Sequence, residues 1–217
     1  MRTWKALLCA AALLSGCGNE DPSPVAPGKT PADTTGNGGV VKKAGTLPMT
    51  VSAGFAPSGY MGDGGSTPGA VAMTTTDCLA PRSAGAVGDC YKVTYKPGGA
   101  GWAGVYWQYP GNNWGGSQGF KVDAGATKVT FWAAGETDGI DLEISAGGIN
   151  PYGAEGAFSD AFTAKKNIKL GTAWAKYTLD LGAPTYTSVL GGFCWAMPAL
   201  AGGAPAVFWL DGIQWEK

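Results

Sequence analysis

Short runs of apolar and β-branched residues alternate with clusters of glycine, proline, asparagine and aspartate from Leu47 to the end of the chain. Such runs, bounded by turn residues, are typical of β-strands, and no segment of useful length has the 3.6-residue apolar period of a helix. The pattern therefore predicts an all-β fold, an antiparallel β-sandwich or jelly roll of about ten strands. The expected strands are Met49–Ala53, Ala70–Thr75, Cys90–Tyr95, Ala103–Tyr109, Lys128–Ala134, Ile140–Ser145, Phe162–Leu170, Ala175–Leu181, Gly191–Met197 and Ala206–Trp215.

Odd–even alternation in three of these strands separates the side chains of the two sheet faces. The positions expected to face the core are Val105, Trp107, Val129, Phe131, Ile140, Leu142 and Ile144, and those expected to face outward are Tyr106, Gln108, Thr130, Trp132, Asp141 and Glu143. If the three strands share one sheet, its outer face combines two flat rings with carboxylates and an amide, which suits a polyhydroxylated sugar ring. The loop PGNNWGG adds Asn112, Asn113 and Trp114 as a rim. The alternative is that these aromatic residues belong to the core.

Composition and charge narrow the classes of function. The 37 glycines follow no fixed period, as expected for short strands joined by tight turns. The 15 basic and 16 acidic residues form no basic stripe, so we expect no nucleic-acid partner. Histidine is absent from the sequence, which removes the commonest general base near neutral pH, the usual zinc ligand and every imidazole-based triad.

The N-terminus has the features of an export signal. Two positive charges precede the apolar run ALLCAAALL, and small residues follow it, so residues 1–16 are predicted to be a signal peptide. The sequence LSGC resembles the lipobox of bacterial lipoproteins. That resemblance implies cleavage before Cys17, acylation of Cys17, and a lipid anchor that makes the membrane a partner. Gly18 in place of aspartate implies the outer membrane of the cell envelope. An ordinary secretory signal with a chance cysteine is the alternative.

Residues 17–45 contain four prolines, several glycines and almost no large apolar residues, which predicts a disordered linker. Its expected span is about 30 Å, enough to hold a domain of residues 46–217 away from the lipid headgroups.

Three cysteines remain in that domain. An exported compartment permits disulfides, and Cys78 and Cys90 flank a short loop, so we expect them to be bonded. Cys194 lies in the strand-like segment GGFCWAM, which favours a buried free thiol.

Several segments, in order, resemble bacterial carbohydrate-binding modules with the galactose-binding-like jelly roll. They are GYMGDG, GWAGVYWQYPGNNWG, ATKVTFWAAG, GTAWAKYTLDLG, SVLGGFCWAM and VFWLDGIQWE. The resemblance implies a non-catalytic protein that binds a poly- or oligosaccharide. In many such modules an aspartate of the last strand helps to hold a structural calcium, which here points to Asp211 with Asp63. The module's next aspartate is Gly212 in this chain, and calcium takes six to eight oxygens. A turn-forming aspartate is therefore the alternative.

A polysaccharide-active enzyme is the second hypothesis. The segment GIDLEI is similar to the catalytic strand of laminarinase-type glycosidases, but Gly139 stands where those enzymes have the nucleophilic glutamate, leaving Asp141 and Glu143. Lyases of the jelly-roll type need a group that neutralises the uronate, and Arg82 is the only arginine after the leader. A structural or adhesion protein is the third hypothesis. We expect a monomeric carbohydrate-binding protein that requires no cofactor.

Overall fold

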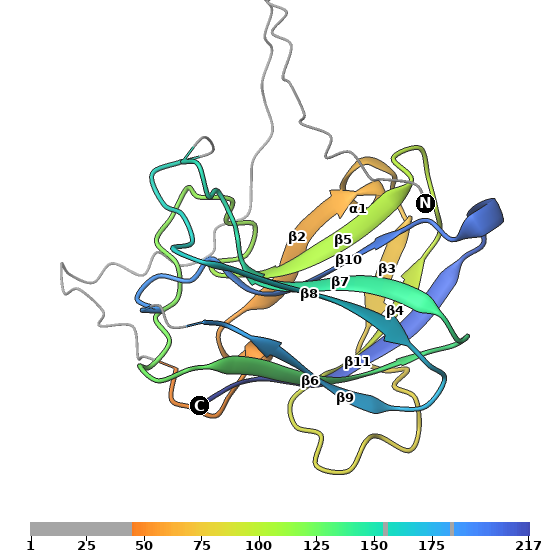
Figure 1. Ribbon diagram of the computed structural model, residues 1–217. Coiled ribbons are helices and arrows are strands. Elements are labelled where there is room, and N and C mark those ends of the chain that lie inside the picture. Colours follow the sequence, from red (N-terminus) through yellow and green to blue (C-terminus); the bar gives the residue numbers. More distant parts are fainter. Residues whose placement is uncertain (1–44, 154–155, 183–184) are drawn as a thin grey trace, which may run out of the picture. The chain divides into compact units, whose positions relative to one another are not determined.

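Two antiparallel sheets face each other in the computed structural model, which describes residues 45–153, 156–182 and 185–217 (Figure 1). The five-stranded sheet has the order β2 (Ala56–Gly62), β5 (Trp102–Gln108), β10 (Gly191–Pro198), β7 (Ile140–Gly147) and β8 (Thr163–Leu170). The six-stranded sheet has the order β3 (Val71–Thr74), β4 (Cys90–Tyr95), β11 (Ala206–Glu216), β6 (Lys128–Gly135) and β9 (Ala175–Asp180), and β1 (Met49–Thr50) also pairs with β11. The predicted antiparallel sandwich is confirmed.

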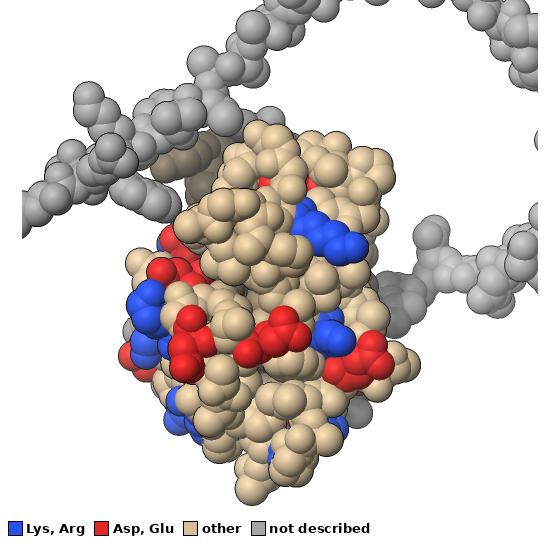
Figure 2. All heavy atoms as spheres, turned by 90° about the vertical axis from the view of Figure 1, so that its right-hand side faces the viewer, with Lys and Arg blue, Asp and Glu red and all other residues tan. Residues whose placement is uncertain are grey.

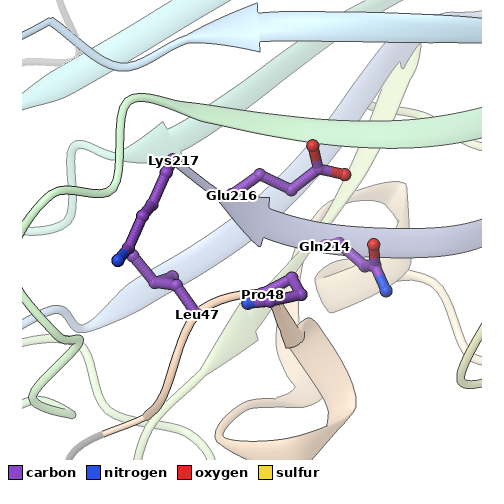
Figure 3. A pocket seen from close by; sticks show the side chains of 5 residues that line it. All are labelled: Leu47, Pro48, Gln214, Glu216 and Lys217. Carbon is purple, nitrogen blue, oxygen red and sulfur yellow. The ribbon is translucent and has the colours of Figure 1, made fainter.

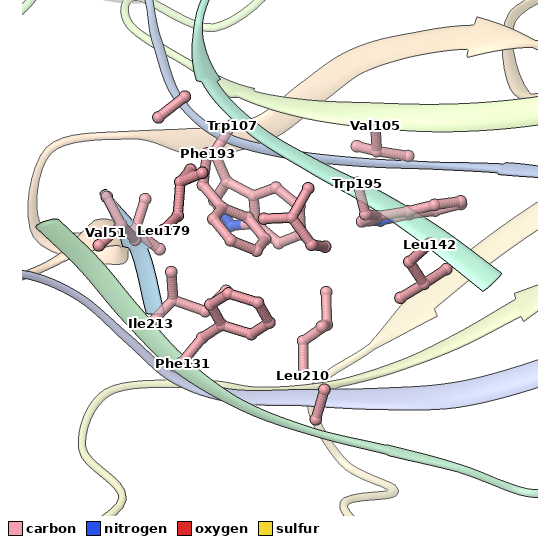
Figure 4. Packing of buried hydrophobic residues seen from close by; sticks show 14 of the residues in the cluster. Val51, Val105, Trp107, Phe131, Leu142, Leu179, Phe193, Trp195, Leu210 and Ile213 are labelled. Carbon is pink, nitrogen blue, oxygen red and sulfur yellow. The ribbon is translucent and has the colours of Figure 1, made fainter. Parts of the chain in front are cut away.

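The apolar faces of the two sheets meet in one core (Figure 4). Phe193 and Trp195 of the five-stranded sheet pack against Phe131 and Phe208 of the six-stranded sheet, and Trp107 packs on Phe193, with ring centroids 5.1–5.3 Å apart in edge-to-face pairs. This is the geometry that aromatic quadrupoles prefer. All seven positions that alternation assigned to the core are buried, so the inward half of that prediction is confirmed.

The strand predictions fail mainly near the start of the domain. The predicted strand Met49–Ala53 is the two-residue β1 followed by the 3-10 helix η1 (Val51–Ala53). Strand β2 was not predicted, because proline and glycine interrupt its sequence APSGYMG. Those residues are tolerated there because β2 is an edge strand, where a missing N–H costs no ladder bond. Two short helices, α1 (Asp63–Ser66) and η2 (Ala201–Gly203), complete the elements of the described residues.

The cysteines of the domain lie as predicted. Cys78 and Cys90 form a disulfide, and Cys194 is a buried free thiol. The signal peptide, Cys17 and, except for Gly45, the linker lie outside the described residues. Within the described residues, no helix has the length and apolar character needed to cross a membrane.

Candidate functional site

The outer face of the five-stranded sheet, which points away from the core, is only partly covered. Strand register places Met61, Gly104, Ala196, Glu143 and Asn167 in one row across all five strands. The next row toward the start of β5 contains Trp102, Pro198, Asp141 and Lys169, and all four are exposed. We call these two rows the open face. They bring residues of five strands, which are separate in the sequence, onto one surface.

Trp102 is the large aromatic residue of the open face, with 42% of its surface exposed. It is the first residue of β5 and has the same strand parity as Gly104 and Tyr106. The predicted strand began one residue later, at Ala103, and therefore missed it. The alternation that pointed Tyr106 outward would have found Trp102 if it had been extended by two steps toward the N-terminus.

The open face has a floor next to Trp102. Gly104 and Ala196 are paired across β5 and β10. A Cβ atom at Gly104 would lie 2.9 Å from both Met61 Cε and the Trp195 carbonyl oxygen, so a larger residue does not fit without displacing Met61 or the backbone. Gly104 is buried, and the Met61 methyl group lies over it, so Met61 and Ala196 form a low floor between Trp102 and Glu143.

The polar side of the open face comes from the β7–β8 hairpin. Lys165 Nζ lies 2.7 Å from Glu143 Oε1, and Lys169 Nζ lies 2.5 Å from Asp141 Oδ1. Both pairs are exposed, and such pairs stabilise a protein by at most about 1 kcal/mol, so these groups can exchange partners for ligand hydroxyls at little cost. Asn167 adds an exposed amide. The outward positions predicted for Asp141 and Glu143 are correct.

Two loops cover the other end of this sheet, and we call their described residues the wall (residues 110–119, 147–153 and 156–162). Tyr106 lies beneath the wall, packed edge-to-face on Trp114, and its hydroxyl donates a hydrogen bond to the Gly147 carbonyl.

Gln108 is also buried beneath the wall, and its side-chain amide donates to the Asn113 carbonyl. The side chain of Asn113 bonds to backbone groups of Tyr109, Gly115 and Ser117. Hence the exposed positions predicted for Tyr106, Gln108 and Asn113 are wrong, because loops cover that part of the sheet. Trp114 is half-buried in the wall.

Asp160 anchors the wall. Its carboxylate accepts backbone hydrogen bonds from Ile149, Leu190 and Gly191 at 2.7–3.2 Å, which join the wall to the start of β10. Burial raises the pKa of Asp160 to about 6, although these three hydrogen bonds oppose the shift.

That shift predicts a pH-dependent stability. Because the folded protein holds this proton more tightly than the unfolded chain, the stabilisation is complete below about pH 4 and is lost as the pH rises through 6. A rise of the Asp160 pKa from 3.8 to about 6 corresponds to about 3 kcal/mol of folding free energy. Urea unfolding between pH 4 and 7 should show this fall in the wild type, and Asp160→Asn should flatten it. The exposed Asp180→Asn is the control, and an equal slope in both variants would contradict the assignment.

Trp132 lies on the other sheet. It belongs to β6, where its neighbours across the strands are Asp211 of β11 and Lys176 of β9. The expectation that Tyr106, Trp132 and Glu143 share one sheet is therefore wrong. The reason is the crossing of the chain, because β5, β6 and β7 alternate between the two sheets.

The loop of residues 75–89 covers this part of the six-stranded sheet. Arg82 binds both carboxylate oxygens of Asp211, whose side chain is fully buried, and donates to the Gly88 carbonyl. The indole N–H of Trp209 donates to the backbone carbonyl of Asp77, and the indole N–H of Trp174 donates to the backbone carbonyl of Pro81. Together with the disulfide, these contacts make the loop a fixed part of the domain.

The two aspartates predicted to bind calcium do not fit that ion. Arg82 takes the cation's position at Asp211. Asp63 accepts hydrogen bonds from the Tyr95 hydroxyl and the Gly98 and Ala100 amides, and the Tyr95 bond lowers the pKa of Asp63 against the effect of its burial. Among the described residues, one group of three potential metal ligands lies close together, namely Asp211, Cys78 and Cys90. The two cysteine sulfurs are bonded to each other in the disulfide, so they do not ligate a metal. The carboxylates that would face calcium are thus occupied by protein donors.

Neither the face drawn in Figure 2 nor the hollow drawn in Figure 3 offers a competing site among the described residues. Positive and negative side chains are interspersed over the face in Figure 2, without a large patch of one sign. A shallow hollow lies at the end of β11, lined by Leu47, Pro48, Gln214, Glu216 and Lys217 (Figure 3). Its carboxylate, Glu216, accepts a hydrogen bond from Thr130 and lies 4.0 Å from the ammonium groups of Lys128 and Lys176. The hollow lacks an exposed aromatic ring among its lining residues.

No protein-family model and no curated protein matches the sequence. Solved structures similar to it are β-sandwich carbohydrate-binding modules. The family 11 module of the cellulosomal cellulase Lic26A-Cel5E of Clostridium thermocellum has a TM-score of 0.45 at 13% identity, covering 80% of this chain and 95% of the module. A family 30 module has a TM-score of 0.43 at 14% identity, covering 81% and 87%. TmCBM61, in complex with β-1,4-galactotriose, has a TM-score of 0.38 at 15% identity, covering 75% and 90%. These likenesses are distant, so the function has to come from the residues of this chain.

Proposed function

We propose that this domain binds a poly- or oligosaccharide, without catalysis, on the open face of the five-stranded sheet. The observation that carries the proposal is the position of Trp102. It is exposed, beside a low floor of Met61 and Ala196 and on the same face as the polar groups of β7 and β8. An aromatic face covers the apolar C–H side of a pyranose, while carboxylate, amide and ammonium groups bind its hydroxyls. The open face offers both within one surface.

The dimensions of the open face fit an oligosaccharide or polysaccharide chain rather than a single sugar ring. Five strands at a spacing of about 4.8 Å give four gaps and about 19 Å from β2 to β8. That length fits roughly three or four extended β-linked pyranose units. The wall closes the face on the side of Tyr106, so we expect the saccharide to run across the strands.

Catalysis is the weaker alternative for the same residues. Asp141 and Glu143 lie on one strand, are exposed, and each pairs with a lysine of β8. A glycosidase needs one carboxyl group with a raised pKa and a second across the scissile bond. Gly139, at the position of the missing nucleophile, lies in a turn with φ of 88°. The arrangement supports binding of hydroxyl groups better than bond cleavage.

Affinity electrophoresis of the purified protein tests the proposal. Gels containing β-glucans, xyloglucan, β-mannan, galactan or the acidic polygalacturonate would each measure retardation of the protein. We expect retardation by one or a few of the β-glucan- or hemicellulose-like polymers, with no release of reducing sugar. If no polymer retards the protein, the scaffold or adhesion hypothesis becomes the better one. New reducing ends would instead favour an enzyme.

We also propose that Cys17 is acylated and tethers the domain to the outer membrane of the cell envelope. The support is the LSGC sequence and the linker composition of residues 17–45. Expression in a bacterial host with labelled palmitate should label the wild type and leave Cys17→Ser unlabelled. Label on Cys17→Ser, or an unlabelled wild type, would contradict the anchor.

A further inference from the structure

A buried carboxylate lies just after the end of β2, the edge strand next to β5 in the sheet that carries the open face. Asp63, in α1, is completely buried. Its oxygens accept hydrogen bonds from the Tyr95 hydroxyl at 2.6 Å, the Gly98 amide at 2.8 Å and the Ala100 amide at 2.7 Å. We call this arrangement the Asp63 latch. It connects the end of β2 to the turn of residues 96–101, which leads from β4 into β5.

That turn has little conformational preference of its own. Its sequence, KPGGAG, contains three glycines, and Gly101 has a φ of 74° that other residues rarely adopt. A Cβ atom at Gly98 would lie 2.8 Å from both Asp63 Oδ1 and Thr67 Oγ1, so the chain approaches the latch more closely than any other residue allows. The hydrogen bonds of Asp63 therefore fix a segment that would otherwise be loose.

The turn ends at Trp102, the aromatic residue of the open face. The residue before Asp63 contacts Trp102 as well. A Cβ atom at Gly62 would lie 2.8 Å and 2.9 Å from two atoms of the indole ring, so the ring lies against the bare Gly62 backbone. One dipeptide thus supports Trp102 from two sides, through the ring and through the chain that leads to it.

We infer that Gly62 and Asp63 are positioning residues, which hold the Trp102 ring in the orientation that stacks on sugar. This rests on the proposed function. An aromatic ring that is ordered before binding loses less conformational entropy on binding. The latch therefore increases the affinity for saccharide without touching it. It also accounts for a fully buried carboxylate without a basic partner among its hydrogen bonds.

Two neighbouring glycines provide a matched test. Gly98→Ala places a methyl group against the latch, whereas a Cβ atom at Gly99 meets no atom within 4 Å. The variants Gly98→Ala and Gly99→Ala would both be labelled with 5-fluorotryptophan. The ¹⁹F signal of Trp102 would be identified as the one that is absent from Trp102→Phe. We expect Gly98→Ala to shift or broaden that signal alone and to weaken retardation by the panel polymers about three- to ten-fold. Gly99→Ala should leave both unchanged.

A second pair acts on the same carboxylate without altering the turn sequence. Tyr95→Phe removes one donor to Asp63, and Tyr91→Phe removes the equivalent hydroxyl, which donates to Asp89, from the same strand. We expect the Trp102 signal and the affinity to change only in Tyr95→Phe.

The outcomes separate the inference from the proposed function. Weaker binding with an unchanged Trp102 signal would show a merely structural role and overturn the inference. So would equal effects within each matched pair, or no effect in any variant. If the wild type binds no polymer, the proposed function fails, and the ¹⁹F signal still decides whether the latch positions Trp102.

Discussion

Replacing Trp102 with alanine should weaken saccharide binding about ten-fold, whereas replacing Trp132 should leave it unchanged. Loss of one stacking ring costs about 1–2 kcal/mol, which is about a ten-fold change in dissociation constant. Trp102 is exposed on the open face of the five-stranded sheet. Trp132 is on the six-stranded sheet, beside the loop of residues 75–89, where a Cβ at Gly212 would touch both Trp132 and Ala86. The pair therefore compares one residue type on two opposite surfaces.

Affinity electrophoresis and titration calorimetry with the polymers that retard the wild type would measure this difference. Near-ultraviolet circular dichroism and thermal unfolding provide the control that both variants are folded at the assay temperature. Weaker binding by Trp132→Ala with full binding by Trp102→Ala would place the saccharide on the six-stranded sheet. That result would overturn the open face as the site.

Replacing Arg82 with alanine should lower the free energy of unfolding by about 2–3 kcal/mol. Asp211 has a fully buried side chain, and breaking a buried ion pair leaves an uncompensated charge, at a cost of about 3–5 kcal/mol. The Arg82 side chain is 42% exposed, so water reduces that cost. Urea unfolding at neutral pH, with the disulfide intact, measures the change.

Lys165→Ala is the matched control, because it breaks the exposed pair with Glu143 and should cost less than about 1 kcal/mol. Adding Asp211→Asn to Arg82→Ala removes the unpaired charge and should restore part of the lost stability. Calcium and EDTA should leave the wild-type Tm unchanged, since Arg82 neutralises Asp211. A Tm that rises with calcium, or an Arg82→Ala variant as stable as Lys165→Ala, would show that this carboxylate has another partner.

Local patterning was sufficient for most of the fold. Runs such as Cys90–Tyr95 and Lys128–Ala134 place an apolar residue at every second position, because one of their faces is buried in the core, and they became β4 and β6 with little change. Strand β2 escaped prediction because its pairing with β5 is decided by tertiary contacts and not by the propensities of proline and glycine. The disulfide was predictable because only three cysteines remained and two flanked a short loop.

For the saccharide site, the sequence predicted which side chains point outward but not which of them share an accessible surface. Alternation gives the parity of each residue within its own strand, and it correctly turned Asp141, Glu143 and Trp132 away from the core. It carries no information about which strands share a sheet, nor about which loops lie over the outer face. Consequently Trp132 was assigned to the wrong sheet, and Tyr106 and Gln108 were assigned to the surface although the wall covers them.

Sequence patterns alone were enough to predict an all-β domain with a sandwich core, the Cys78–Cys90 bond and the inward or outward parity of its strands. These properties follow from contacts between residues close in the chain and from the two-residue repeat of a strand. The three-dimensional fold was needed to reveal three further features. Trp102, Ala196, Glu143 and Asn167 share one surface, Arg82 neutralises Asp211, and Asp63 supports the turn before Trp102. Each of these joins segments far apart in the sequence, so each depends on how the chain crosses between the sheets.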